Sequence, residues 1–204
     1  MEEPRVAEGL RFAARAAREP SATVRLWKIL SGRKVVGCPP RFPVPELFHC
    51  VGMLPVIARY EGELRSLEPL IDEWVDLPDP FPPGLDGALD WVESIAEQAE
   101  ALSGEPCTEG AVERSMRAYR ERDALAERLS GSRPASPGYL EPGTLRDVID
   151  AGRFLPVETH AILLKRILGE EYAEGSAGDA DGGDPFLLLA RRTRAEMDKE
   201  GDPE

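Results

Sequence analysis

The spacing of apolar residues predicts helical structure at the start of the chain. Between residues 8 and 30 these residues recur at intervals of three and four, as on one face of a helix. Pro20 interrupts the run, and because proline lacks a backbone N–H, it marks either a break or the start of a second helix. The residues of this stripe are Leu10, Phe12, Ala13, Ala16, Val24, Trp27 and Leu30.

The pattern changes to short apolar runs after residue 34. "VVG" suits a buried strand, "PELFHCVGM" a short helix with Glu46 in its first turn, and "LPVIARY" a second strand. A strand, a helix and a strand in this order predict a βαβ unit with parallel strands. Residues 61–73 are weakly amphipathic, and "EWVDLP" is a candidate third strand.

Helical periodicity returns after "PDPFPPG", where four prolines in seven residues can continue neither a helix nor a strand. One helix is predicted to stop at Gly104, and the next to begin after Thr108, a residue type that caps helix N-termini. Two further helices are predicted near residues 142–151 and 156–168. The stripes of the first two helices are Leu85, Leu89, Val92, Ile95, Ala96, Ala99 and Leu102, and then Val112, Met116, Tyr119, Ala126 and Leu129.

These elements predict an α/β fold, with a partial Rossmann-like parallel sheet in the N-terminal half followed by a helical region. We expect residues 1–80 to form the α/β unit with its N-terminal helix, and residues 81–169 to form the helical region. Residues 170–184 are rich in Gly and Asp and predict an acidic linker. For residues 185–204 we expect a C-terminal helix and a tail.

The negative net charge of the chain argues against two classes of binding partner. Acidic residues outnumber basic ones by 38 to 25, which gives a net charge of −13. Because binding to nucleic acids and anionic membranes depends on clustered Lys and Arg, we expect neither kind of partner. No apolar run approaches the ~20 residues that span a bilayer, and the N-terminus lacks the apolar core of a signal peptide. A cytoplasmic location is therefore expected.

The chain has three cysteines, Cys38, Cys50 and Cys107, which are candidates for a metal site or a nucleophile. Their odd number and the absence of close CxxC spacing disfavour a disulfide framework and a metal site built wholly from this chain. Cys50, on the short helix, is interpreted as a small buried hydrophobe. His49 and His160 belong to no Ser-His-Asp pattern, and the chain has neither a phosphate loop nor a GxGxxG signature.

The stretch "VVGCPPRFPVPELFHCVGMLPV", residues 35–56, resembles the 2-hydroxyacyl-CoA dehydratase and benzoyl-CoA reductase family. Subunits of that family carry Val-Gly-Tyr, then a Tyr, then Pro-Glu-Glu-Leu, then Ala-Ala-Gly with two hydrophobic residues and Pro-Val. Residues 85–129 are similar to the family's pair of long helices, with Tyr119 and Arg120 where Tyr-Asn is usual. The matching residues of the first stretch are Val36, Gly37, Phe42, Val44, Pro45, Glu46, Leu47, Cys50, Val51, Gly52, Met53, Leu54, Pro55 and Val56.

The resemblance implies a fold and an activity. Two related subunits of the family's enzymes have Rossmann-like domains, and each holds a four-iron cluster on three cysteines. A separate ATP-driven activator delivers a single electron, which the enzyme uses to remove water from a 2-hydroxyacyl-CoA or to reduce an aromatic CoA ester. The acyl-CoA and the cluster lie between the domains.

The chain also departs from the family pattern. It is about half the usual length, and the C-terminal Rossmann-like domain with its cluster cysteine is missing. Cys38 falls near the loop of polar active-site residues, but Pro40 or Arg41 stands where Ser or Thr is expected. Cys50 stands where the family has alanine, and Cys107 lies in the turn between the helices. None of the three cysteines matches a ligand position.

We therefore expect a shortened subunit that binds no cluster by itself and acts with a full-length subunit of the same family, lending structure or part of an acyl-CoA pocket. An ATP-dependent activator is then a further partner of the complex. Cys38 and Glu46 are the candidates for catalysis, and Phe42, Glu46 and Arg41 for substrate binding; no residue is assigned to a metal. Glu46 also has a structural interpretation, because free backbone N–H groups in a first helical turn stabilise a carboxylate.

Two alternatives stay open at this point. In the first, the chain is a catalytic dehydratase or reductase subunit in which Cys38 and Cys50 join ligands from a partner at a shared 4Fe-4S cluster. In the second, it is a noncatalytic interaction module that uses its terminal helix and its acidic charge to bind a basic partner. Arg191, Arg192 and Arg194 are interpreted as a solvated face of that helix.

Overall fold

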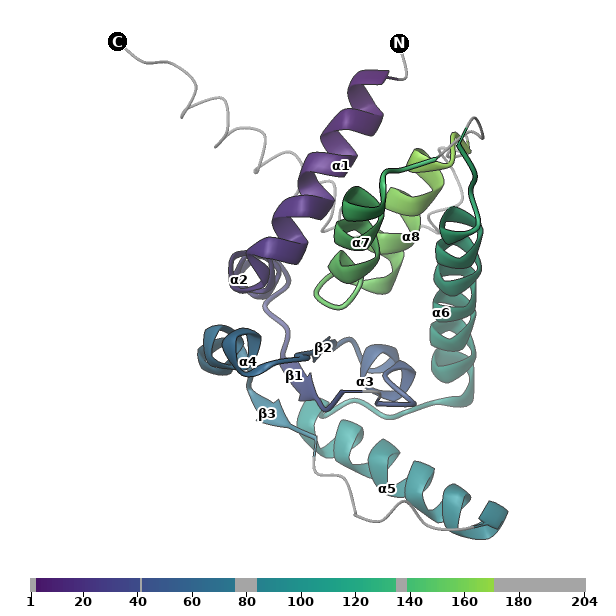
Figure 1. The fold of residues 1–204 in the computed structure, drawn as a ribbon. Coiled ribbons are helices and arrows are strands. Elements are labelled where there is room, and N and C mark those ends of the chain that lie inside the picture. The colour runs from purple at the N-terminus through teal and green to yellow at the C-terminus, as the bar shows by residue number, and fades with distance from the viewer. Residues whose placement is uncertain (1–2, 41, 76–83, 135–138, 171–204) are drawn as a thin grey trace.

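A small parallel sheet lies at the centre of a mostly helical molecule (Figure 1). The computed structural model describes residues 3–40, 42–75, 84–134 and 139–170. The strands are β1 (Val35–Cys38), β2 (Leu54–Ile57) and β3 (Glu73–Trp74), in the order β2-β1-β3. Both pairings are parallel, which confirms the predicted βαβ unit and the third strand.

Two helices precede the sheet, α1 (Glu3–Arg18) and α2 (Pro20–Ser31). Pro20 is the first residue of α2, a position where the missing N–H of proline would have no partner in any case. It therefore starts a second helix, one of the two outcomes that the sequence left open. Gly32 ends α2 in the left-handed conformation, with φ of 65°, and donates its N–H to the Lys28 carbonyl.

The connection between β1 and β2 contains α3 (Glu46–Cys50), and Gly52 turns the chain into β2 with φ of 77°. After β2 come α4 (Glu61–Leu67), a 3-10 turn (Glu68–Leu70) and β3. Gly37 in the middle strand leaves room for the Trp74 ring, because a Cβ at residue 37 would lie 2.4 Å from a ring carbon. The glycine thus permits β3 to pair beside β1 with its tryptophan lying across the strand.

The second half of the chain is helical: α5 (Gly84–Ser103), α6 (Glu109–Ser130), α7 (Pro142–Ala151) and α8 (Val157–Ile167). These bounds confirm the predicted helices. Thr108 caps α6, because its side chain accepts a hydrogen bond from the N–H of Ala111. The predicted proline-rich linker, apart from Gly84, and the predicted acidic linker, apart from Glu170, lie outside the described residues, as does the predicted terminal helix.

Three groups of buried side chains hold these elements together. One joins α1 to α6, α7 and α8, a second joins β1 and α3 to α5, and a third joins α2 and α4 to β1 and β2. Figure 1 shows α1 beside α7 and α8 on one side of the sheet and α5 on the other. Helices from both sides of the predicted boundary at residue 80 therefore share a core.

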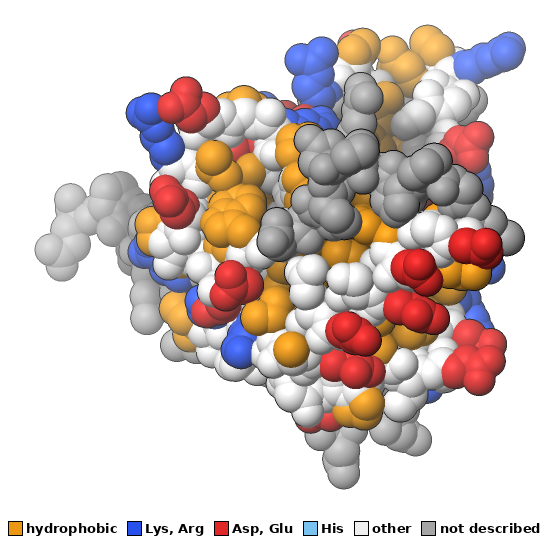
Figure 2. Space-filling model, turned by 90° about the horizontal axis from the view of Figure 1, so that it is seen from below, with side chains coloured by type: hydrophobic (Ala, Val, Ile, Leu, Met, Phe, Trp, Pro, Cys, Tyr) orange, Lys and Arg blue, Asp and Glu red, His pale blue; other side chains and the backbone are white. Residues whose placement is uncertain are grey.

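The α/β class is confirmed in its coarse form. The sheet found in the described ranges has three short strands, so the Rossmann-like assignment remains a prediction. Among the described helices, none combines the length and the apolar character needed to cross a membrane. On α5 the exposed side chains include five carboxylates and no Lys or Arg, and acidic groups gather on the face seen from that side (Figure 2). These carboxylates are Asp86, Asp90, Glu93, Glu97 and Glu100.

Candidate functional site

Two of the residues predicted to form a site are part of the hydrophobic core. Cys38 at the end of β1 is 0% exposed, and burial raises the pKa of its thiol to about 12. Phe42 is 5% exposed, with its ring 5.8 Å from that of Phe48 and 6.3 Å from that of Trp91. In these positions both side chains stabilise the packing of α3 and α5 on the sheet. Arg41 lies outside the described residues.

Glu46 begins α3 and is half-buried between that helix and α6. Burial raises the pKa of its carboxyl; the hydrogen bond from its own backbone N–H and the charge of Arg122 act in the opposite direction but are weaker. The first-turn position therefore stabilises the carboxylate only in part. The backbone carbonyl of Glu46 has a separate role, because it accepts a hydrogen bond from Ser115 on α6.

A network of polar side chains that the sequence did not reveal connects α3, α6 and α8. His49 on α3 lies 2.8 Å from Ser115 Oγ through Nδ1, and its Nε2 lies 3.1 Å from a carboxylate oxygen of Glu158. We call these three residues the His49 network. They come from positions 66 and 109 residues apart, so no local motif brings them together.

The His49 network has the residue types of a Ser-His-Glu triad but not the required arrangement. Ser115 is 1% exposed and donates its hydroxyl proton to the Glu46 carbonyl, 2.9 Å away. A hydroxyl that is enclosed by protein and donates its proton to a backbone carbonyl is neither activated by His49 nor open to a substrate, so Ser115 is not a candidate nucleophile. The network is suited to joining three helices.

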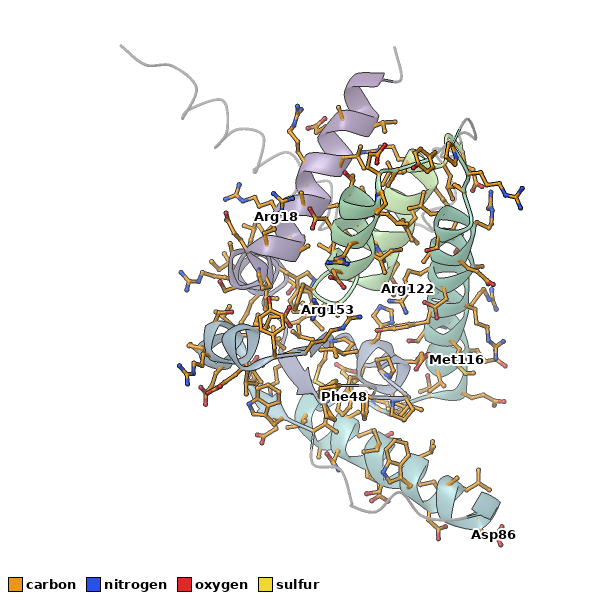
Figure 3. The ribbon with its side chains drawn as sticks, viewed as in Figure 1. Arg18, Phe48, Asp86, Met116, Arg122 and Arg153 are labelled. Carbon is orange, nitrogen blue, oxygen red and sulfur yellow. The ribbon has the colours of Figure 1, made fainter. Side chains whose placement is uncertain are left out.

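The pKa of Glu158 agrees with a structural role for the His49 network. Burial acts to raise the pKa of its carboxyl, but the hydrogen bond and the charge of His49 outweigh it, and the pKa is lowered. Tyr119 packs edge-on against the His49 ring at 5.7 Å, and burial raises the pKa of its phenol. Arg122 lies over the Tyr119 ring at 4.8 Å and extends from α6 toward the interior (Figure 3).

Replacing His49 by alanine is expected to lower the free energy of unfolding by about 1–2 kcal/mol, since the Ser115 hydroxyl and the Glu158 carboxylate both lose a partner. The value includes a discount because the Glu158 side chain is 58% exposed. Urea unfolding of wild type, His49→Ala, Ser115→Ala and the double variant measures the coupling between the two residues. Additive effects of the two substitutions would contradict the network.

A second feature lies on the other side of α3, where Cys50 meets Cys107 in the turn between α5 and α6. Their sulfur atoms are 3.6 Å apart, and the Cys50 thiol also faces the Leu47 carbonyl at 3.1 Å. Burial raises the pKa of Cys50 to about 12 and also raises that of Cys107. Cys50 is therefore not the isolated small hydrophobe that the sequence suggested, but one member of a thiol pair.

Cys50 also lines a cavity of about 590 Å³ at the ends where β1 and β2 begin. The Arg33 guanidinium lines this cavity and lies directly against Gly52. A Cβ atom on residue 52 would be 2.3 Å from an Nη atom of Arg33, so the glycine makes room for the guanidinium. Lys34 donates to the Leu102 carbonyl and so connects β1 with α5. The remaining lining comes from Gly32, Val51, Gly52, Met53, Ser103, Glu105, Pro106, Thr108 and Ala111.

The three thiols do not form the three-ligand set that the family uses for its cluster. The free thiols of Cys50 and Cys107 are hydrogen-bonded to each other and to the Leu47 carbonyl. Cys38 is enclosed in the core, and its thiol is directed at the Val36 carbonyl, 4.0 Å away. Within the described ranges, no three or more His, Cys, Asp or Glu side chains are grouped so as to hold a metal ion. The predicted absence of a cluster on the isolated chain is not tested by this geometry.

No protein-family model matches the chain, and no curated protein matches it. The assignment to a family accordingly remains a prediction that depends on the residues quoted above.

Proposed function

We propose that the chain is a member of the 2-hydroxyacyl-CoA dehydratase and benzoyl-CoA reductase family that binds no cluster by itself. In this proposal it acts in the cytoplasm with a full-length subunit, to which an ATP-dependent activator delivers the electron. The chain contributes structure and part of an acyl-CoA pocket. The observation that carries the proposal is the packing of the two family-like segments around one cavity.

The first family-like segment forms β1, α3 and β2, and the second forms α5 and α6. Both α5 and α6 pack against α3, and Ser115 and Cys107 of the second segment contact Glu46 and Cys50 of the first. Segments that resemble one family in the same order along the chain are thus also neighbours in the folded protein. This arrangement supports a retained structural unit rather than two chance similarities.

The cavity at this junction has the chemical character that a CoA ester requires. Arg33 and Lys34 bring two positive charges and Glu105 one negative charge, so the cavity is positive overall in a molecule of net charge −13, and phosphate groups bind such basic side chains. Val51, Met53 and Ala111 provide an apolar part for the rest of the ligand. Phe42 and Glu46 do not line this cavity, so the proposed pocket uses different residues from those expected from the sequence.

A thermal shift with CoA esters tests the proposal. At 100 times its dissociation constant, a CoA ester should stabilise the chain by about 2.7 kcal/mol, which raises the Tm by roughly 5–11 °C for a chain of this size. Arg33→Glu should weaken binding at least about tenfold, because the substitution reverses one charge beside the phosphates. The corresponding free acids, which lack the phosphates, should give no shift.

Arg133→Glu is the matched control. Arg133 is exposed just beyond the other end of α6, a helix of 22 residues that spans about 33 Å. The control makes the same charge change far from the cavity and should leave the CoA shift intact. An unchanged Tm with every CoA ester tested, or an equal loss of CoA affinity in Arg33→Glu and Arg133→Glu, would contradict the proposed pocket.

A further inference from the structure

The pair of thiols at the junction of α3 with the α5–α6 turn has chemistry that the proposed function does not use. Cys50 is the last residue of α3, and Cys107 lies 57 residues later, just before the cap of α6. Their sulfur atoms are 3.6 Å apart, and a disulfide bond brings two sulfurs to about 2.05 Å. Closing this gap requires the sulfur atoms to approach by about 1.5 Å.

We propose that Cys50 and Cys107 form a reversible dithiol–disulfide site whose co-reactant is a small anionic disulfide of the glutathione type. The site opens into the same cavity as the proposed pocket, but its chemistry needs only the two thiols and access to one of them, so it does not depend on CoA binding. It differs from the disulfide framework of a secreted protein, because the bond forms in an already folded chain and links two packed elements.

Access to the pair comes from the cavity. Cys50 is among its lining residues, and the cavity volume of about 590 Å³ admits a molecule larger than water. Arg33 and Lys34 line the same cavity together with Glu105, which leaves one net positive charge there to attract an anionic reagent. The Glu100 carboxylate accepts the N–H of Cys107 at 2.6 Å and opposes this attraction close to the thiols. Cys38 is 0% exposed, so the same reagent cannot reach it without unfolding.

The reaction is a balanced exchange of thiols and disulfides. The Cys50 sulfur, after losing its proton to solvent, attacks one sulfur of the reagent; the reagent's S–S bond breaks, and one reagent thiol leaves. Cys107 then attacks Cys50 Sγ in the mixed disulfide and expels the second reagent thiol. The two cysteines lose two protons and two electrons, and the reagent takes them up as two thiols. A reducing dithiol reverses both steps.

The environment of the thiols sets the rate of this exchange. Burial raises the pKa of both groups, and because the thiolate is the attacking species, oxidation at neutral pH is slow. The charge of Glu100 acts in the same direction on both thiols. The rate should therefore increase about tenfold per pH unit between neutrality and pH 9. Cys50 is the first attacker because it lines the cavity through which the reagent enters, whereas Cys107 is not among the lining residues.

The test is mass spectrometry of the intact folded chain after incubation with glutathione disulfide. The expected product has lost two hydrogen atoms, carries no glutathione, and yields a peptide that joins Cys50 to Cys107 after digestion without reduction. Dithiothreitol should restore the starting mass. The oxidised protein should also unfold at a higher temperature than the reduced one, by several degrees, since the bond closes a long loop.

Variants distinguish this site from unspecific thiol reactivity. Cys107→Ala should accumulate a stable glutathione adduct on Cys50, and Cys38→Ala should form the cross-link as fast as wild type. Hydrogen peroxide serves as a neutral oxidant, and Arg33→Glu should slow the reaction with glutathione disulfide but not with peroxide. A wild-type product with a lasting adduct and no Cys50–Cys107 peptide, or a cross-link that includes Cys38, would overturn the proposal, whatever the result with CoA esters.

Discussion

Replacing Glu63 by alanine is expected to lower the free energy of unfolding by about 3 kcal/mol, because the substitution removes the main counter-charge of a nearly buried guanidinium. Only the longer ion pair of Arg153 with Asp150, at 3.5 Å, then remains. Glu63 on α4 is 4% exposed, and its carboxylate accepts hydrogen bonds from Arg153 at 2.7 and 2.9 Å. It also accepts the backbone N–H of Arg59 at 2.8 Å. Arg153, labelled in Figure 3, additionally donates to the Ile57 carbonyl at the end of β2. The pair therefore connects α4, the end of β2 and the segment between α7 and α8.

The stability that Glu63 contributes should depend on pH. Burial acts to raise the pKa of its carboxyl, but the hydrogen bonds from Arg153 and Arg59 and the charge of Arg153 outweigh it, so the pKa is lowered. A carboxyl with a lowered pKa stabilises the folded state above its unfolded pKa of about 4.3, and this stabilisation is lost as the pH falls through the folded value. The stability difference between wild type and Glu63→Gln should therefore shrink as the pH falls below about 4.

Urea unfolding at several pH values measures both effects. Glu61→Ala on the same helix is the matched control, since its ion pair with Arg65 is mostly exposed and its loss should cost no more than about 0.5 kcal/mol. The double variant Glu63→Leu with Arg153→Met should be more stable than Glu63→Ala, because it leaves neither charge buried alone. Equal stabilities of Glu63→Ala and Glu61→Ala would contradict the importance of the pair.

Replacing Phe48 by alanine is expected to cost about 3–5 kcal/mol, which is the range for deleting a large buried aromatic ring. Phe48 is 0% exposed and anchors α3 within the group of side chains formed by β1, α3 and α5. The short α3 has five residues, too few for a helix to persist without tertiary contacts. The loss should therefore also loosen the positions of His49 and Cys50.

Chemical unfolding measures the loss of stability in Phe48→Ala, and near-ultraviolet circular dichroism measures the loosening of the packing around α3. Phe48→Leu should cost much less, about 1 kcal/mol, because it fills most of the volume. Leu64→Ala, at a side chain that is 38% exposed, serves as a control and should change the stability only slightly. A cost for Phe48→Ala no larger than that of Leu64→Ala would show that α3 does not depend on this anchor.

Most elements of the fold could be predicted from local patterns. Thr108 indicated a helix start and Gly104 a helix end, and both were confirmed. Pro20 indicated either a break or a helix start, and the structure decided for the start. These features depend on residues close together in the chain: a missing N–H, a capping oxygen, a left-handed turn. The parallel sheet followed from the order of strand, helix and strand, since a parallel pairing needs a crossover.

The site residues were harder to predict, for a physical reason. Cys38 and Phe42 were chosen because of their place in a family-like loop, but the sequence does not say toward which side of a strand or turn a side chain points. The register of β1 against its neighbours and the packing of α5 decide this, and both direct the two side chains into the core.

The sequence by itself determined the helices, the strand order along the chain, the acidic charge and the family-like segments. The tertiary structure alone decided the His49 network, the Cys50–Cys107 pair and the buried pair of Glu63 with Arg153. The residues in direct contact lie 57 to 109 positions apart in the chain and come from different elements. Such contacts form only where packing brings the elements together, because hydrogen bonds and thiol contacts act over a few ångströms and leave no periodic trace in the chain.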